Sequence, residues 1–377
     1  MGEEPSNHSG GASTLSLVIL TIVAIVAFVA VGALTRAYRA QELGLAQRWA
    51  ARAAAESEHS NFRATAFAYR AALHYARENP AYLMGLARSL VALQRTQEAE
   101  PYLLSLWEQH PEDGAVNLEL ARVYAQSGET EKAMRYYHNA IYGIWKENPD
   151  AERRQARLEL VDFFLRRGAR EQAQAELIAM ASNLPDDVSL RLMTGGLFLE
   201  VGDYVHALQQ YKAVIRMDPN NDAALAGAGR ASFELANYAG AQNYLQRAVA
   251  GNPHDQASAD LLKTTSLILK LDPFTRRASS AARVRSALDA FSAASQRLQS
   301  CISSQPPNGS LQDLSTKLNS IKPRLNVRRL EQDSDLLDQA MELVFAIERE
   351  TAPICGTGSP ADQALLTIAG QRGGNER

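Results

Sequence analysis

The side chains of this sequence that could catalyse a reaction or bind a metal are scattered rather than grouped. No two of its seven histidines stand four residues apart on one predicted helix in the HExxH manner. GxSxG, P-loop and GxGxxG motifs are absent, and the glycine-rich GAGRAS segment at Gly227 lies inside a predicted helix. Because no set of nucleophile, base and oxyanion-stabilising group can be assembled, we expect no enzyme activity, no metal, no cofactor and no small-molecule substrate.

Cys301 and Cys355 are the only cysteines of the chain. Two cysteines exclude a disulfide-dense scaffold and a four-cysteine zinc site. They form either one disulfide or two free thiols. A disulfide would indicate an oxidising compartment.

One short segment, RYYHNAIYGIW, is unusually rich in aromatic residues. Tyrosine and tryptophan dominate the energetics of protein interfaces, which makes Tyr136, Tyr142 and Trp145 a candidate secondary binding surface. The alternative is that these side chains belong to a core, as aromatic runs at helical spacing usually do. We favour the core interpretation.

The composition is that of a folded protein without a strong electrostatic bias. Of the 377 residues, 46% are apolar and 21% are charged, and the formal net charge is -3. These values leave no broad basic face, so a nucleic-acid partner is not expected.

The N-terminal part combines a polar tail with a long apolar segment. Residues 1–14 consist largely of glycine, serine and acidic residues, a composition typical of a disordered tail. Leu15 to Leu34 carries no charge, and about 20 helical residues suffice to cross a bilayer core of about 30 Å. A signal peptide would have a basic start, a shorter apolar core and a small-residue cleavage site. We therefore expect an uncleaved transmembrane helix over residues 15–35.

The charges beside this segment bear on the membrane side of the rest of the chain. The N-terminal flank has no lysine or arginine, whereas Arg36, Arg39, Arg48 and Arg52 follow the apolar segment. Positive flanks are retained in the cytoplasm, which favours a cytoplasmic location. The two cysteines leave a periplasmic or other extracytoplasmic location as the alternative.

A column of small residues recurs along the middle of the chain. Its members are Thr65, Ala99, Ala133, Ala173, Ala207 and Ala241, separated by 34, 34, 40, 34 and 34 positions. The residues four positions later alternate between tyrosine and leucine: Tyr69, Leu103, Tyr137, Leu177, Tyr211 and Leu245. A fixed period of this length indicates a repeat protein. Six units fill residues 46–255, starting at Ala46, Pro80, Gly114, Arg154, Val188 and Asp222.

Each unit resembles the tetratricopeptide repeat, a helix–turn–helix of 34 residues. The eighth place carries the small residues Ala53, Ala87, Ala121, Gly195 and Gly229, the turn carries Gly128, Gly168 and Gly202, and the thirty-second place carries Pro111, Pro185, Pro219 and Pro253. Small residues allow close helix packing, glycine permits a left-handed turn, and proline ends the second helix. Arg77 and Trp145 replace that proline in the first and third units, where we expect longer second helices that account for the interval of 40.

The resemblance implies an all-α fold, a right-handed helical-repeat solenoid with an N-terminal transmembrane helix and a small C-terminal helical bundle. We expect the anchor helix to run on through Arg36 to Ala54 as the front cap, and residues 256–272 to form the rear cap. The C-terminal domain, residues 273–369, should contain three helices, over residues 275–303, 309–321 and 324–351, which would bring Cys301 and Cys355 to one end. Residues 370–377 should form a disordered tail.

In this family the second, fifth, ninth, twelfth and thirteenth places face a concave groove. The ninth places include Arg88, Arg122, Asp162 and Arg230, and Arg166 occupies a thirteenth place. Arginine binds carboxylates in a two-pronged manner, so this partly basic groove is the candidate partner-binding site, although solvated surface arginines are the alternative. The lysine and asparagine set by which some members hold a terminal carboxylate is missing.

The predicted function is that of a membrane-anchored scaffold that binds partner proteins or peptides, themselves membrane-associated, through the groove. The alternative is a periplasmic-facing assembly or secretion factor for envelope or polysaccharide machinery.

Overall fold

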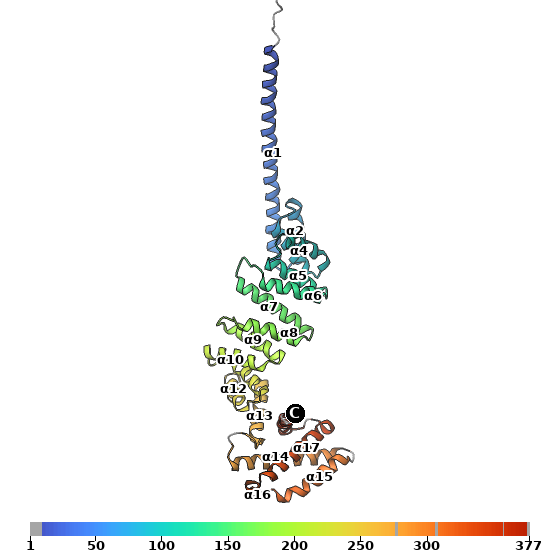
Figure 1. The fold of residues 1–377 in the computed structure, drawn as a ribbon, viewed down its shortest axis with the longest axis vertical. Coiled ribbons are helices and arrows are strands. Elements are labelled where there is room, and N and C mark those ends of the chain that lie inside the picture. The colour runs from blue at the N-terminus through green and yellow to red at the C-terminus, as the bar shows by residue number, and fades with distance from the viewer. Residues whose placement is uncertain (1–9, 276–277, 306–307, 357, 375–377) are drawn as a thin grey trace, which may run out of the picture. The chain divides into compact units, whose positions relative to one another are not determined.

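The computed structural model describes residues 10–275, 278–305, 308–356 and 358–374. Within these ranges the regular secondary structure is entirely helical, which confirms the all-α prediction (Figure 1). The chain divides into two compact units, Met1–Ala169 and Arg170–Arg377, called the first and second unit below.

The first unit begins with one long helix, α1 (Gly10–Glu58). Its apolar part is fully exposed, as Leu17 and Phe28 show, so it is not the core helix of a soluble domain. Of the described helices, only this one is long and apolar enough to cross a membrane, a criterion that a signal sequence also meets. Its first residues, 10–14, lie in the predicted tail, and the rest of that tail lies outside the described residues.

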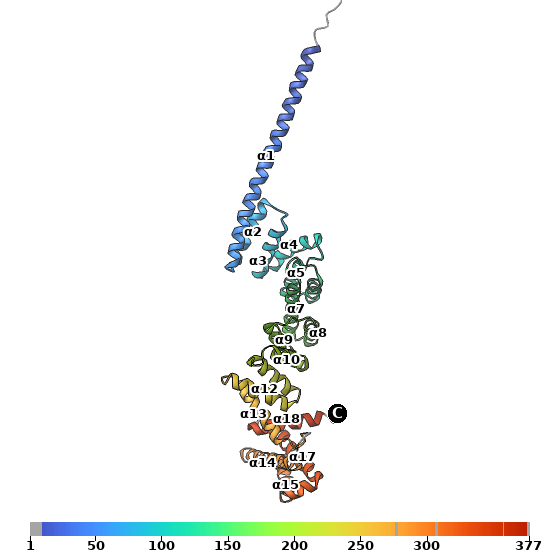
Figure 2. The ribbon, with the colours of Figure 1, turned by 90° about the vertical axis from the view of Figure 1, so that its left-hand side faces the viewer.

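The C-terminal end of α1 is the first helix of the repeat array. Ala46 and Ala53 are completely buried there, and α1 packs along α2 (Phe62–Tyr75) without an intervening linker (Figure 2). Helix α1 therefore continues without a break into the first repeat.

Five further described helices complete the first unit: α3 (Pro80–Ala92), α4 (Thr96–Gln109), α5 (Gly114–Gln126), α6 (Thr130–Tyr142) and α7 (Pro149–Arg166). Thr65, Ala99 and Ala133 are at most 1% exposed, and the eighth-place residues Ala87 and Ala121 are also buried. The column of small residues thus lies where paired helices approach most closely. A larger side chain at the eighth or twentieth place would hold the two helices apart.

The interval of 40 residues has a different structural cause from the predicted one. Helix α6 ends at Tyr142 and is no longer than α4, and α2 is likewise of ordinary length, so the prediction of longer second helices is wrong. The inserted residues form a loop in which Ile144 accepts a hydrogen bond from Gly114 N–H at 2.9 Å and donates one to the Glu112 carbonyl at 2.8 Å. Helix α7 then starts at Pro149, a residue suited to the first turn of a helix.

The turn inside each repeat has the same left-handed backbone in all six units. Gly128, Gly168 and Gly202 have φ of 80°, 72° and 89°, as predicted. The corresponding non-glycine residues Ser60, Gln94 and Ala236 have φ of 56°, 58° and 56°. The packing of the helices imposes this conformation, since three units adopt it without the residue that favours it.

The second unit continues the repeat pattern with α8 (Arg170–Ala181), α9 (Val188–Val201), α10 (Tyr204–Met217), α11 (Asp222–Glu234), α12 (Tyr238–Gly251) and α13 (Gln256–Leu271). Ala173, Ala207 and Ala241 are completely buried. Helix α13 packs against α12 and buries Ile268 and Leu271, as a rear cap should.

The C-terminal part contains more helices than the predicted three: α14 (Ser280–Ser304), α15 (Gly309–Ile321), the 3₁₀ helix η1 (Lys322–Arg324), α16 (Val327–Gln332), α17 (Ser334–Cys355) and α18 (Pro360–Gly374). The single helix predicted over residues 324–351 is interrupted at Asp333, whose carboxylate caps α17 by accepting from Leu336 N–H at 2.9 Å. Helix α18 packs against α13 and extends past residue 370, where a disordered tail was predicted. Residues 375–377 of that tail lie outside the described residues.

Candidate partner-binding groove

The groove residues of the first unit lie on the first helices of successive repeats. Arg88 belongs to α3, Arg122 to α5 and Asp162 to α7. Helices α3, α5 and α7 are consecutive neighbours, so these ninth-place residues share one face, called the inner face below.

Arg122 on the inner face is held by two carboxylates. Its Nε and Nη2 donate to Glu159 at 2.8 and 2.6 Å, and its Nη1 donates to Glu119 at 2.8 Å. Glu119 is buried and also accepts from Nε of Arg88 at 2.9 Å. The ladder Arg88–Glu119–Arg122–Glu159 therefore joins α3, α5 and α7.

The ladder changes the expected charge of the groove. Burial of the Glu159 carboxyl works against its ionisation, but the hydrogen bonds and charge of Arg122 hold its pKa below the usual range. Arg122 is thus neutralised within the fold. Arg88 also pairs with a carboxylate, Glu119, but its side chain is 55% exposed.

Two cavities open on the inner face. One, of about 290 Å³, has the rings of Tyr137 and Phe163 in its wall and Gln126 at its rim, beside Arg122 and Glu159. At its edge Asp162 and Arg166 form an exposed ion pair at 2.9 Å, and the Arg167 guanidinium lies 4.2 Å from the centre of the Phe163 ring.

The other cavity, of about 340 Å³, lies between the first and second repeats. Its lining residues include Thr65, Tyr69, Met84, Gly85 and Arg88. Of these residues, only Arg88 was predicted to be a site residue. Tyr69 belongs to the alternating tyrosine–leucine column, and that alternation was the signal that could have identified it.

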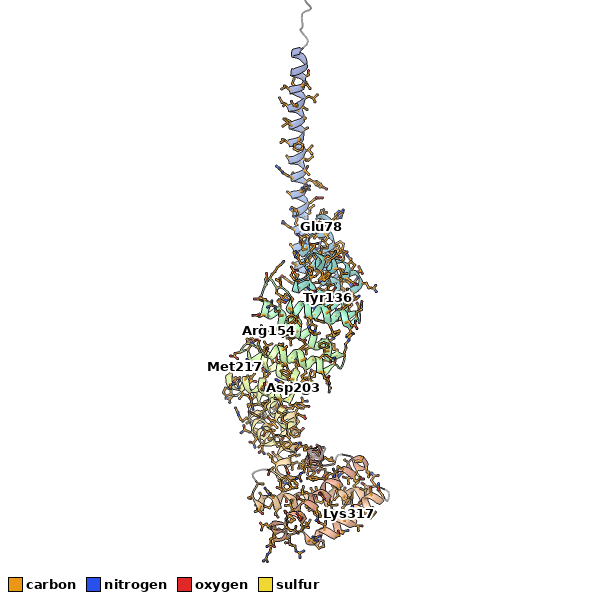
Figure 3. All side chains as sticks on the ribbon, in the orientation of Figure 1. Glu78, Tyr136, Arg154, Asp203, Met217 and Lys317 are labelled. Atoms are coloured by element: carbon orange, nitrogen blue, oxygen red, sulfur yellow. A yellow bond between two sulfur atoms is a disulfide. The ribbon has the colours of Figure 1, made fainter. Side chains whose placement is uncertain are left out.

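The aromatic segment is divided between core and surface. Tyr136 is 5% exposed and stacks on Tyr124 with ring centres 5.3 Å apart; it lies among the helices of the first unit (Figure 3). The Trp145 ring packs on Gly114, and its indole N–H donates to the Ala140 carbonyl at 2.8 Å. Tyr136 and Trp145 are therefore packed against the fold, whereas the Tyr142 side chain is 75% exposed.

The remaining candidate residues lie in the second unit. Arg230 is exposed on α11 and forms no ion pair within the described part of the chain. Cys301 and Cys355 form a disulfide that joins α14 to the end of α17, with their Cα atoms 5.8 Å apart.

A buried polar cluster lies close to this disulfide in sequence and structure. Arg297, one helical turn before Cys301, donates to the Thr351 carbonyl and pairs with Asp362 at 3.9 Å. Burial and the nearby Asp362 raise the pKa of Glu348 to about 8, against the opposing effect of Arg297. Across the described residues no group of three or more histidine, cysteine, aspartate or glutamate side chains is placed to hold a metal ion.

The ladder yields a stability prediction. Arg122→Ala should lower the free energy of unfolding by about 2 kcal/mol at neutral pH, because the buried Glu119 and the half-buried Glu159 lose hydrogen bonds to a charged donor. Glu159 has a depressed pKa in the folded chain, so its contribution is present above its unfolded pKa of about 4.3 and is lost as the pH falls below that value. The variant should therefore lose less stability on acidification than the wild type, in urea unfolding monitored by circular dichroism.

Arg166→Ala is the matched control, because the Asp162–Arg166 pair is exposed on α7. Removing it should change stability by less than about 0.5 kcal/mol. Equal losses for the two variants would contradict a structural role for the ladder.

Comparison with known families identifies the repeats. A tetratricopeptide-repeat family profile matches residues 90–141 and 198–264, and a second tetratricopeptide-repeat profile matches residues 158–222. No curated protein sequence matches the chain significantly.

Similar solved structures include the C-terminal part of a TPR repeat-containing protein from Cytophaga hutchinsonii, which is 13% identical, with 69% of this chain and 97% of that one covered and a TM-score of 0.45. PilW, described as a widely conserved type IV pilus biogenesis factor, is 15% identical, with 59% and 98% covered and a TM-score of 0.40. YrrB, a TPR protein with an unusual peptide-binding site, is 17% identical, with 52% and 97% covered and a TM-score of 0.38.

The profile matches coincide with the units in which the small-residue column is buried and the turns are left-handed. The chain therefore contains tetratricopeptide repeats over these matched segments.

Proposed function

We propose that the chain is a membrane-anchored scaffold that binds partner proteins or peptides on the inner faces of its repeats. The observation that carries this proposal is the pair of cavities on the inner face of the first unit. Each combines aromatic or apolar wall residues with polar groups, the composition that protein-binding sites use for affinity and specificity.

The continuous helix α1 supports the anchoring part of the proposal. Its exposed apolar segment and its packed C-terminal end belong to one helix, so no flexible linker separates the segment from the first repeat. A scaffold held at a membrane meets membrane-associated partners at a raised effective concentration.

Photo-crosslinking tests the choice of face. A photoreactive amino acid at Gln126, at the rim of the 290 Å³ cavity, should crosslink a partner in intact membranes, identified by mass spectrometry. The same amino acid at Asn139, an exposed position on α6, is the matched control and should give no such product. A product from Asn139 but not from Gln126 would place the partner on the other face and overturn the proposal.

A second candidate function is an extracytoplasmic assembly or secretion factor. The disulfide between Cys301 and Cys355 favours it, because structural disulfides persist in oxidising compartments. The arginines that follow the apolar segment favour the opposite side of the membrane. The two candidates differ in the membrane side on which partners are met, and the inner-face binding mode is common to both.

Thiol trapping in intact cells separates these candidates. For the extracytoplasmic candidate, a bulky maleimide added under denaturing conditions should label neither cysteine unless a reductant is added first. Full labelling without reductant would show that both cysteines are free thiols. That result would support the cytoplasmic candidate and contradict the extracytoplasmic one.

A further inference from the structure

Glu348 on α17 is a buried carboxyl group that the fold leaves without a partner. The residue is 1% exposed, and neither of its carboxylate oxygens has a hydrogen-bond partner among the described residues. An ionised carboxylate that is neither paired nor hydrogen-bonded is strongly destabilised away from water. Glu348 therefore holds its proton in the folded domain at neutral pH, and burial accordingly raises its pKa to about 8.

The cationic group beside this carboxyl is engaged elsewhere. Arg297 of α14 donates to the carbonyl groups of Thr351 and Gly356, and Thr351 lies one turn after Glu348 on the same helix. Arg297 also pairs with Asp362 at 3.9 Å. Its Nε is buried and has no hydrogen-bond partner within the described residues. An unused donor of Arg297 and the unused oxygens of Glu348 thus belong to one polar cluster.

Asp362 links this cluster to the last helix, α18. Its carboxylate accepts a hydrogen bond from Ser359 N–H at 2.6 Å, and the Ser359 hydroxyl accepts one from Asp362 N–H at 3.4 Å. This reciprocal arrangement is a capping box, which satisfies two N–H groups at the start of a helix. Because Arg297 pairs with the same Asp362, it holds the start of α18 beside α14.

Helix α18 covers the rear end of the repeat array. It packs against α13, and its Gln371 amide donates to the Tyr238 hydroxyl of α12 (Figure 2). The Arg372 guanidinium lies 3.3 Å from the centre of the Phe274 ring. The apolar residues that α18 buries are Ala364, Leu365, Ile368 and Ala369. Two of these are alanines, so the attachment of α18 depends strongly on the polar contacts at its start.

We propose that protonated Glu348 is a latch that keeps α18 on the rear cap of the array. While Glu348 is neutral, Arg297 stays with Asp362 and α18 remains attached. When Glu348 ionises, its carboxylate draws the guanidinium of Arg297 away from Asp362, and α18 is released. Release uncovers the face of α13 that α18 occupies, so the proton on Glu348 decides whether the rear end of the array is closed.

The charged groups that act on Glu348 come from two of the helices packed on α17. Arg297 faces it from α14 and favours its ionisation, whereas Asp362 faces it from α18 and opposes it. Within the described residues, α15 and α16, which also pack on α17, bring no further charge to this cluster. On α17 itself the neighbouring Arg349 and Glu350 are exposed. The balance at Glu348 is therefore set by one cation and one anion.

The disulfide determines which part of the cluster separates. Cys301 and Cys355 join α14 to the end of α17, which keeps Arg297 beside the Thr351 carbonyl. Helix α18 begins after this link, at Pro360. It is therefore the element that leaves when its pairing with Arg297 is lost.

The attachment of α18 should weaken as the pH rises. With α18 in place the pKa of Glu348 is about 8, whereas an exposed glutamate has a pKa of about 4.3. The contribution of Glu348 to attachment is therefore complete below about pH 4.3 and is lost as the pH rises through about 8. Between these values the attachment constant should fall by up to about tenfold per pH unit.

Hydrogen–deuterium exchange of the full chain in detergent, with the disulfide intact, tests the latch. Exchange rates at pH 6 and pH 8.5 are each divided by the intrinsic chemical rate at that pH. Amides of α18 should lose at least about tenfold of their protection at pH 8.5, whereas amides of α17 around Val344 should keep theirs. Glu348→Gln carries a permanently neutral side chain, so its α18 should stay protected at both pH values.

Glu342→Gln is the matched control, because Glu342 is an exposed carboxyl on the same helix. Its α18 should lose protection at pH 8.5 as the wild type does. Asp362→Asn keeps an oxygen that can accept from Ser359 N–H but removes the negative charge that opposes ionisation of Glu348. The loss of α18 protection should therefore level off at a lower pH in this variant.

Three outcomes would overturn the latch. The first is equal protection of α18 at pH 6 and pH 8.5 in the wild type. The second is an unchanged pH dependence in Glu348→Gln. The third is a joint loss of protection in α17 and α18, which would show unfolding of the whole C-terminal domain instead of the release of one helix.

Discussion

The close approach of paired helices at a column of small residues is the contact on which the repeat array depends. Alanine or threonine at the twentieth place is buried in every repeat, and a small residue or valine is buried opposite it at the eighth place. Close packing of this kind fixes the rotation of each helix about its axis. It therefore decides which places point into the core and which are left on the inner face for partners.

The inner face is less uniformly basic than its sequence suggests. Arg88, Arg122 and Arg230 are equivalent by place in the repeat, but Arg122 is held by Glu119 and Glu159, and Arg88 also pairs with Glu119. The sequence could not reveal this difference, because Glu159 is 37 residues away and its approach depends on the register between α5 and α7.

The features that the sequence predicted well are periodic and local. The helix starts at Pro80 and Gly114 and the left-handed turns at Gly128 and Gly202 each depend on a pattern within about one repeat. Helix lengths around the insertion were predicted wrongly, because nothing local distinguishes a longer α6 from a loop that pairs with the start of α5. The break between helices α16 and α17 at Asp333 could have been predicted from the sequence, because aspartate is a preferred residue at the N-cap of a helix.

Oxidative footprinting of side chains, with and without the partner recovered by crosslinking, tests most directly that partners occupy the inner face. Met84 lies in the inner-face cavity of the first two repeats, whereas Phe67 is exposed on the other side of α2. If the inner face binds the partner, oxidation of Met84 should slow in the complex while that of Phe67 stays unchanged. Protection of Phe67 with unchanged oxidation of Met84 would contradict the account.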